Sequence, residues 1–176
     1  MPENKREGSD MADVETLGEL SELTISLAHS VEATYRGLAA MFSHEPEIAQ
    51  FWNLMAEEEA NHARWLTNLH QNLDEHLRHK RVDPRFCEGV HAVLEVPAET
   101  RLEKIGNLDE ALHMALAFET AETNAVFDFL ISDYQLATRA REYLRNQVVV
   151  HVERLNKGLP ERFRDRSVRA VIPAVR

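Results

Sequence analysis

Four long stretches of this chain carry apolar residues at helical spacing, and this periodicity constrains the fold more than any other feature. In the first stretch, residues 17–42, the apolar positions are Leu20, Leu23, Leu27, Val31, Tyr35, Leu38 and Phe42. Residues 43–46 interrupt the pattern, and Pro46 suits the first turn of a new helix. The second stretch then fades near residues 79–82 and stops at Asp83 and Pro84. The sequence therefore predicts two long helices joined by a tight turn.

The second half of the chain repeats this arrangement after a long connection. Residues 83–107 are broken by prolines and glycines, which predicts a crossover with a short helix around residues 87–94. Asn107 or Asp109 is expected to cap a third helix, and a fourth is expected over residues 136–157, ended by Gly158. Two antiparallel hairpins joined by one long crossover predict an all-α four-helix bundle. An extended helical repeat is disfavoured because only two copies exist.

The predicted domain organisation has three parts. Residues 1–14 form a polar leader, residues 15–158 form the bundle with its crossover at 83–107, and residues 159–176 form a C-terminal tail. From residue 157 onward the chain carries six basic and two acidic residues, in a protein of net charge −10. We expect this end to pack on its own bundle or on a twin subunit. The alternative is a docking peptide for another partner.

Composition excludes several classes of function. The net charge of −10 argues against nucleic-acid binding, and no apolar run is long enough to cross a membrane. The polar start of the chain is not that of a signal peptide. Cys87 is the only cysteine, so neither an internal disulfide nor a Cys-x-x-Cys metal site is expected. We expect a cytoplasmic protein that forms a homodimer.

Each helical stripe is interrupted near its middle by side chains that bind metals. These candidate ligands are Glu32, Glu59, His62, Glu119, Glu122 and His151. Residues three apart on a helix point the same way, so Glu59 and His62 can hold one ion together. In a helical hairpin, residues equally far along the chain from the turn lie at the same height. Counting from the two predicted turns places the candidates in two adjacent layers. One layer holds Glu32, Glu59, Glu122 and Val148, and the other holds His29, His62, Glu119 and His151.

Carboxylates buried at one height need positive counter-charge. Only Arg36, Arg64 and Arg154 lie near these positions on the helices, and none is on a predicted inward face. Metal ions are therefore the simplest counter-charge, and a mixture of carboxylates and imidazoles suits iron or manganese, and zinc less specifically.

The neighbours of the candidate ligands allow simpler interpretations. His29 is expected to be an exposed helix residue, with a seventh ligand as the alternative. Tyr35 is expected to be a core residue, with a hydrogen bond to a ligand as the alternative. Glu57 and Glu58 are expected to be solvated.

At these residues the sequence resembles the ferritin-like di-iron carboxylate proteins, and most closely the rubrerythrin group, over residues 17–157. Their pattern is one Glu from each of two helices and Glu-x-x-His from each of the other two. Glu32 and Glu122 match the single glutamates, and Glu59-Ala-Asn-His62 matches one motif. Glu119 resembles the extra third-helix carboxylate of rubrerythrins. The resemblance implies two iron ions per chain that react with dioxygen or peroxide, with Glu59 and Glu122 as bridging ligands.

The chain departs from this pattern in two places. The fourth helix reads Val148-Val-Val-His151, so one expected carboxylate is missing. One cysteine cannot build the four-cysteine rubredoxin module that rubrerythrins usually carry, so redox activity would need an external electron donor or be a slow ferroxidase reaction. The alternative is a bundle with a degraded or single-metal site that acts as a structural or interaction subunit. A DNA-protecting mini-ferritin is disfavoured by the acidity of the chain.

Overall fold

The structure is a computed structural model that describes residues 16–82, 88–122, 150, 153–155 and 157–159. Its helices are α1 (Leu17–Met41), α2 (Pro46–Gln71), α3 (Glu75–Arg78), α4 (Glu88–Leu94), α5 (Ala98–Leu102) and α6 (Leu108–Glu122). Within these ranges the only β pairing is a single bridge between Thr16 and Arg81. The prediction of an all-α fold is therefore confirmed.

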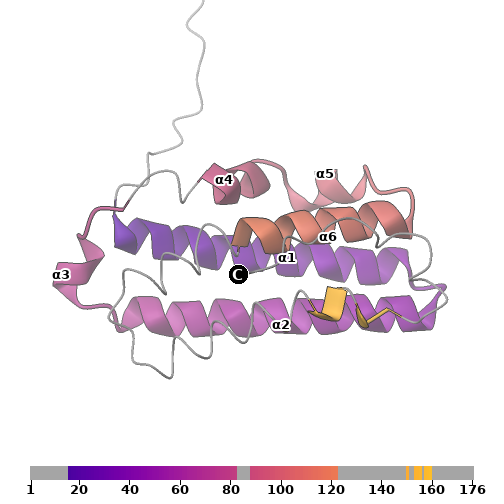
Figure 1. Cartoon of the computed structure of the whole chain (residues 1–176), viewed down its shortest axis with the longest axis horizontal. Coiled ribbons are helices and arrows are strands. Elements are labelled where there is room, and N and C mark those ends of the chain that lie inside the picture. Colours follow the sequence, from indigo (N-terminus) through magenta and orange to yellow (C-terminus); the bar gives the residue numbers. More distant parts are fainter. Residues whose placement is uncertain (1–15, 83–87, 123–149, 151–152, 156, 160–176) are drawn as a thin grey trace, which may run out of the picture.

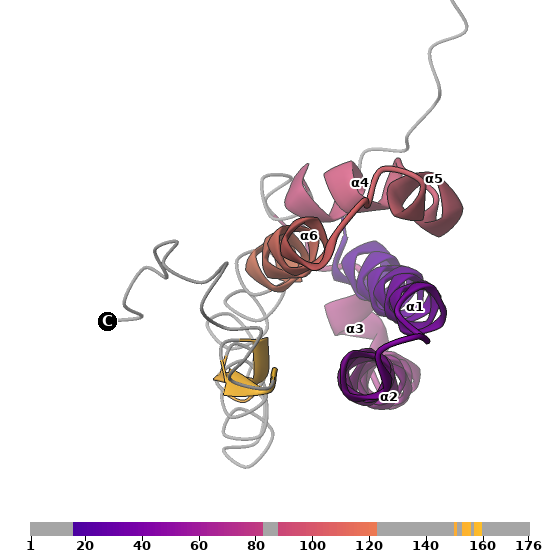
Figure 2. The same cartoon turned by 90° about the vertical axis from the view of Figure 1, so that its right-hand side faces the viewer.

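Helix α1 is the centre of the described part. Figure 1 shows α1, α2 and α6 running lengthwise beside one another, and Figure 2 shows α4 and α5 on the side of α1 away from α2. Helices α2, α4, α5 and α6 all pack on α1, and α4 also packs on α6. The crossover therefore forms a layer over α1 and α6.

The first hairpin follows the predicted stripes closely. A capping box begins α1, because the Thr16 hydroxyl accepts from the Glu19 backbone N–H and the Glu19 side chain accepts from that of Thr16. Pro46 occupies the first turn of α2, as expected. The apolar stripes of both helices meet in the core, where Tyr35 stacks on Trp52 with ring centroids 5.6 Å apart.

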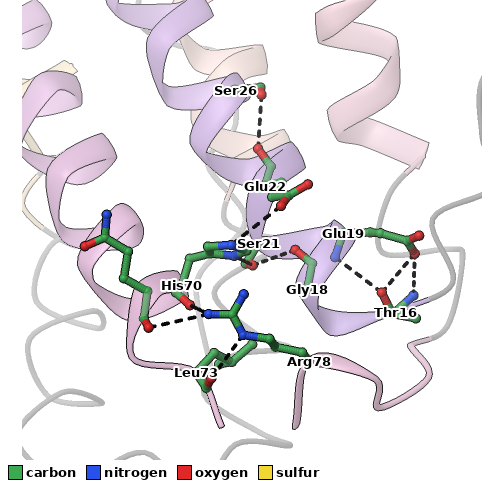
Figure 3. Close-up of polar contacts among 10 residues, drawn as sticks. Thr16, Gly18, Glu19, Ser21, Glu22, Ser26, His70, Leu73 and Arg78 are labelled. Atoms are coloured by element: carbon green, nitrogen blue, oxygen red, sulfur yellow. Dashed lines mark hydrogen bonds and ion pairs between the residues drawn. The ribbon is translucent and has the colours of Figure 1, made fainter. Parts of the chain in front are cut away.

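The end of the hairpin opposite the turn is closed by polar contacts (Figure 3). Helix α2 stops at Gln71, earlier than its stripe indicates, and Arg78 binds at this end. Its Nη2 donates to His70 O in the last turn at 2.9 Å, and its Nε donates to Leu73 O just beyond the helix at 3.1 Å. His70 Nδ1 lies 2.6 Å from the Ser21 hydroxyl on α1. The Leu17 N–H donates to Lys80 O at 2.9 Å. The start of α1 is thus tied to the chain that follows α2.

The crossover contains two helices rather than one. The predicted short helix is α4, whereas α5 has no counterpart in the sequence prediction. Helix α5 approaches α1 at Gly37, where any Cβ atom would collide with the Leu102 side chain. Asn107 caps α6, since its Oδ1 accepts from the Glu110 N–H at 3.0 Å.

Most of the predicted fourth helix lies outside the described residues, as do the leader and, apart from Leu159, the tail. Residues 153–155 are helical and lie against α2, where Arg154 pairs with Glu58. Leu155 and Leu159 are buried, and Gly158 lies close to Phe51. Among the described helices, none is long and apolar enough to cross a membrane.

Candidate metal centre

Glu59 and His62 lie together on the buried face of α2. They continue the stripe of Trp52 and Met55, and Leu66 follows them one turn later, so helical spacing turns both polar groups into the core. Glu59 is fully buried and His62 is 5 % exposed. His62 Nδ1 lies 3.7 Å from Glu59 Oε2. The structure therefore holds a carboxylate and an imidazole side by side in apolar surroundings.

Glu119 reaches the same core from α6. It is 4 % exposed, and the Tyr35 hydroxyl on α1 donates to its Oε1 at 3.1 Å. The Tyr35 ring lies between Trp52 of α2 and Phe118 of α6, with centroids 5.6 and 6.2 Å away. Tyr35 is thus both a core residue and the hydrogen-bond donor that the sequence allowed as an alternative.

Glu32 lies at the edge of α1 rather than deep in the core. Its side chain is 18 % exposed and accepts from Arg36, with Nη2 at 2.7 Å and Nε at 3.0 Å. His29 lies 3.5 Å from Glu32 and has 60 % of its side chain exposed. In this structure, His29 therefore does not join His62 in a buried layer.

The remaining candidates cannot be placed. Glu122 is the last residue of α6, but its side chain lies outside the described residues, and so do Val148 and His151. Among the residues with described side chains, no three histidines, cysteines or carboxylates gather around one point. The six-residue ligand set therefore stays a prediction.

Two charged residues differ from expectation. Glu58 is not solvated, because it pairs with Arg154 and only 17 % of its side chain is exposed. Arg101 of α5 is buried and contacts Phe118, which precedes Glu119. Burial lowers the pKa of Arg101, and the nearby negative charge of Glu99 partly offsets this effect. Arg101 lies in the five-residue helix α5, which is too short for an apolar stripe to indicate that the side chain faces inward.

The buried donors fit an iron site by their chemistry. Glu59 and Glu119 supply carboxylate oxygens and His62 supplies an imidazole nitrogen, all from within an apolar core. A cation held by such donors would balance the charge of buried carboxylates.

Comparison with known proteins identifies the family. The sequence model of the rubrerythrin family matches residues 27–145, which is more than half of the chain. No curated protein matches the chain, and no solved structure matches it. The matched span includes α2 with Glu59 and His62, and α6 with Glu119. The chain therefore belongs to the rubrerythrin family of ferritin-like di-iron proteins.

Proposed function

We propose that this protein binds iron inside its helical bundle and uses it to react with dioxygen or peroxide, as an oxidase, a peroxidase or a ferroxidase. The observation that carries the proposal is the buried Glu59–His62 pair on α2, in a core that also holds the buried Glu119. Membership of the rubrerythrin family supports iron as the metal. Two ions per chain are proposed, with manganese or zinc as alternatives.

The proposed ligands are those predicted from the sequence: Glu32, Glu59, His62, Glu119, Glu122 and His151. Arg154 supports the inclusion of His151, because it follows His151 by three residues and pairs with Glu58, the neighbour of Glu59. Bound iron would supply the electrons for reduction of the oxidant. As an oxidase or peroxidase the protein would need an external electron donor, since one cysteine cannot form a rubredoxin module. As a slow ferroxidase it would need none, because ferrous iron would itself be the substrate.

The protein itself holds and shields the donors. Met55 and Leu66 lie one turn before Glu59 and one turn after His62 on the same buried face of α2, and their burial keeps bulk water away from the pair. The Tyr35 hydroxyl fixes one oxygen of Glu119 and so limits the orientations of that carboxyl group.

Elemental analysis tests the proposal. The parent protein, produced with iron supplied and then dialysed, should retain about two irons per chain. Glu59→Ala and His62→Ala should each abolish stoichiometric iron binding while the helical circular dichroism persists. Glu57→Ala is the matched control, because Glu57 lies on the same helix but is exposed. Parent-like iron content in both site variants would place any metal elsewhere.

A second candidate function is a bundle with a degraded or single-metal site that acts as a structural or interaction subunit. Val148, at the position of an expected carboxylate, favours it. Val148→Glu separates the two candidates. Under the proposed function the present ligands suffice, so iron content and affinity should stay near those of the parent. If the parent instead holds about one iron per chain or none, and Val148→Glu markedly raises the iron content, the result would support the degraded site.

A further inference from the structure

A buried guanidinium from the crossover joins three helices near Glu119. Arg101 of α5 is 7 % exposed. Its Nη1 donates to Thr34 Oγ1 at 2.8 Å, and its Nη2 donates to Ser30 Oγ at 2.8 Å and to Val93 O at 2.6 Å. These contacts connect α5 to α1 and α4 through one side chain.

The same guanidinium also contacts α6. Arg101 Cζ is 5.2 Å from the centre of the Phe118 ring, and that ring also packs against Tyr35. Thr34 precedes Tyr35 and Phe118 precedes Glu119. Arg101 therefore contacts the chain neighbours of both partners in the Tyr35–Glu119 hydrogen bond.

The contacts of Arg101 are unusual for a buried charge. All three hydrogen-bond acceptors are neutral, and no carboxylate within the described ranges forms an ion pair with the guanidinium. Its Nε has no hydrogen-bond partner there either. Apolar residues of similar volume often replace buried charges without loss of stability, so packing alone does not account for an arginine here. An arginine is explained by the two Nη groups of its guanidinium fork, which reach two hydroxyls on α1 while the same group contacts a ring on α6.

We propose that Arg101 is a positioning residue, which holds α1 and α6 at the separation where the Tyr35 hydroxyl reaches Glu119 and thereby orients that carboxyl group for metal binding. The claim that Glu119 is oriented for metal binding rests on the proposed function. The claim that Arg101 places Tyr35 against Glu119 concerns the metal-free protein, so either claim can fail without the other.

The first test uses metal-free protein carrying ¹³C at the Cζ atom of its tyrosines, whose NMR shift responds to the hydrogen bond of the phenol. Tyr35→Phe assigns the signal. Arg101→Met removes the fork and the charge, and Arg101→Lys keeps the charge without the fork. Both variants should move the Tyr35 signal. Lys104→Met, an exposed change in the same crossover, should leave it in place.

The second test is anaerobic titration with ferrous iron. Arg101→Met and Arg101→Lys should weaken binding by about tenfold or more, the usual loss when a residue that orients a metal ligand is changed. Lys104→Met should bind as the parent does. If the parent itself binds no iron, the proposed function fails, while the Tyr35 signal still decides whether Arg101 positions the pair.

Two results would overturn the positioning. In one, the Tyr35 signal is the same in both Arg101 variants and in the parent. In the other, Arg101→Lys restores the signal fully, which would assign the effect to charge rather than to the fork. If Arg101→Met does not fold, Ser30→Ala is the second variant. It removes one hydrogen-bond acceptor of Arg101 and leaves Arg101 and Tyr35 unchanged. It should shift the Tyr35 signal in the same direction but less, and an unmoved signal would count against the proposal.

Discussion

Individual residues at the candidate centre show how this core tolerates polar groups. Glu59, His62 and Glu119 are almost wholly buried, and burial of a polar group is unfavourable unless it gains a partner. Glu59 and His62 lie beside each other, one turn apart on the same helix. Glu119 also accepts a hydrogen bond from a residue 84 positions away, Tyr35. The Tyr35 hydroxyl should therefore contribute measurably to stability.

Replacement of Tyr35 by Phe should lower the free energy of unfolding of the metal-free protein by about 1–3 kcal/mol, the usual loss when a buried hydrogen-bonding group is left unsatisfied. Urea unfolding measures this loss. A double-mutant cycle with Glu119→Met, which removes the acceptor and keeps a similar volume, isolates the Tyr35–Glu119 interaction from other effects of each change. An equal loss in the parent and in the Glu119→Met background would mean that the hydroxyl does not stabilise through Glu119.

At the scale of helices, the sequence predicted what depends on local periodicity. Helices α1 and α2 and the turn between them follow from apolar spacing and from Pro46. The end of α2 does not follow from apolar spacing. It is bound by Arg78, the last residue of α3, which donates to His70 O in the last turn of α2 and to Leu73 O just after it. Helix α5 has five residues, too few to show a helical period, and it is held by its contacts with α1.

The contacts of the candidate site likewise divide into those within one helix, which the sequence predicts, and those between distant segments, which it does not. Glu59 and His62 could be predicted to share a face because they are three residues apart on one helix. The contacts of Tyr35 with Glu119 and of Arg101 with Phe118 join distant segments, and no spacing rule specifies them. The ion pair of Glu32 with Arg36 is again local, because four residues is the spacing at which a carboxylate and a guanidinium pair along a helix surface.

At the scale of the whole molecule, residues 153–155 and 157–159 lie against the first half of α2, where Arg154 pairs with Glu58 and Gly158 approaches Phe51. At Gly158 an added Cβ would lie 2.9 Å from Phe51 Cε2 and 2.5 Å from the Arg154 carbonyl oxygen, and the first of these belongs to a ring in the core. Gly158 therefore lies beside Phe51, whose ring packs on Trp52, and Trp52 in turn stacks on Tyr35.

Gly158→Ala should therefore destabilise the protein by about 1–3 kcal/mol, because the extra methyl group overpacks this contact. Thermal or urea unfolding measures the loss. Gly106→Ala is the matched control, since a Cβ there meets only Glu110 Oε2, at an ordinary 3.4 Å. A stability of Gly158→Ala equal to that of the control would show that Gly158 does not pack against Phe51 in solution.

The α1–α2 hairpin is closed at both ends, by the turn before Pro46 and by the contacts of Ser21, His70 and Arg78 (Figure 3). Neither helix can fray at the far end without releasing the other, so the pair opens as one cooperative unit. Glu59 and His62 lie between these closures. Separation of α1 from α2 therefore admits water to the two side chains only in the same rare event that unfolds the hairpin, and the stability of the hairpin limits how often solvent reaches them from that side.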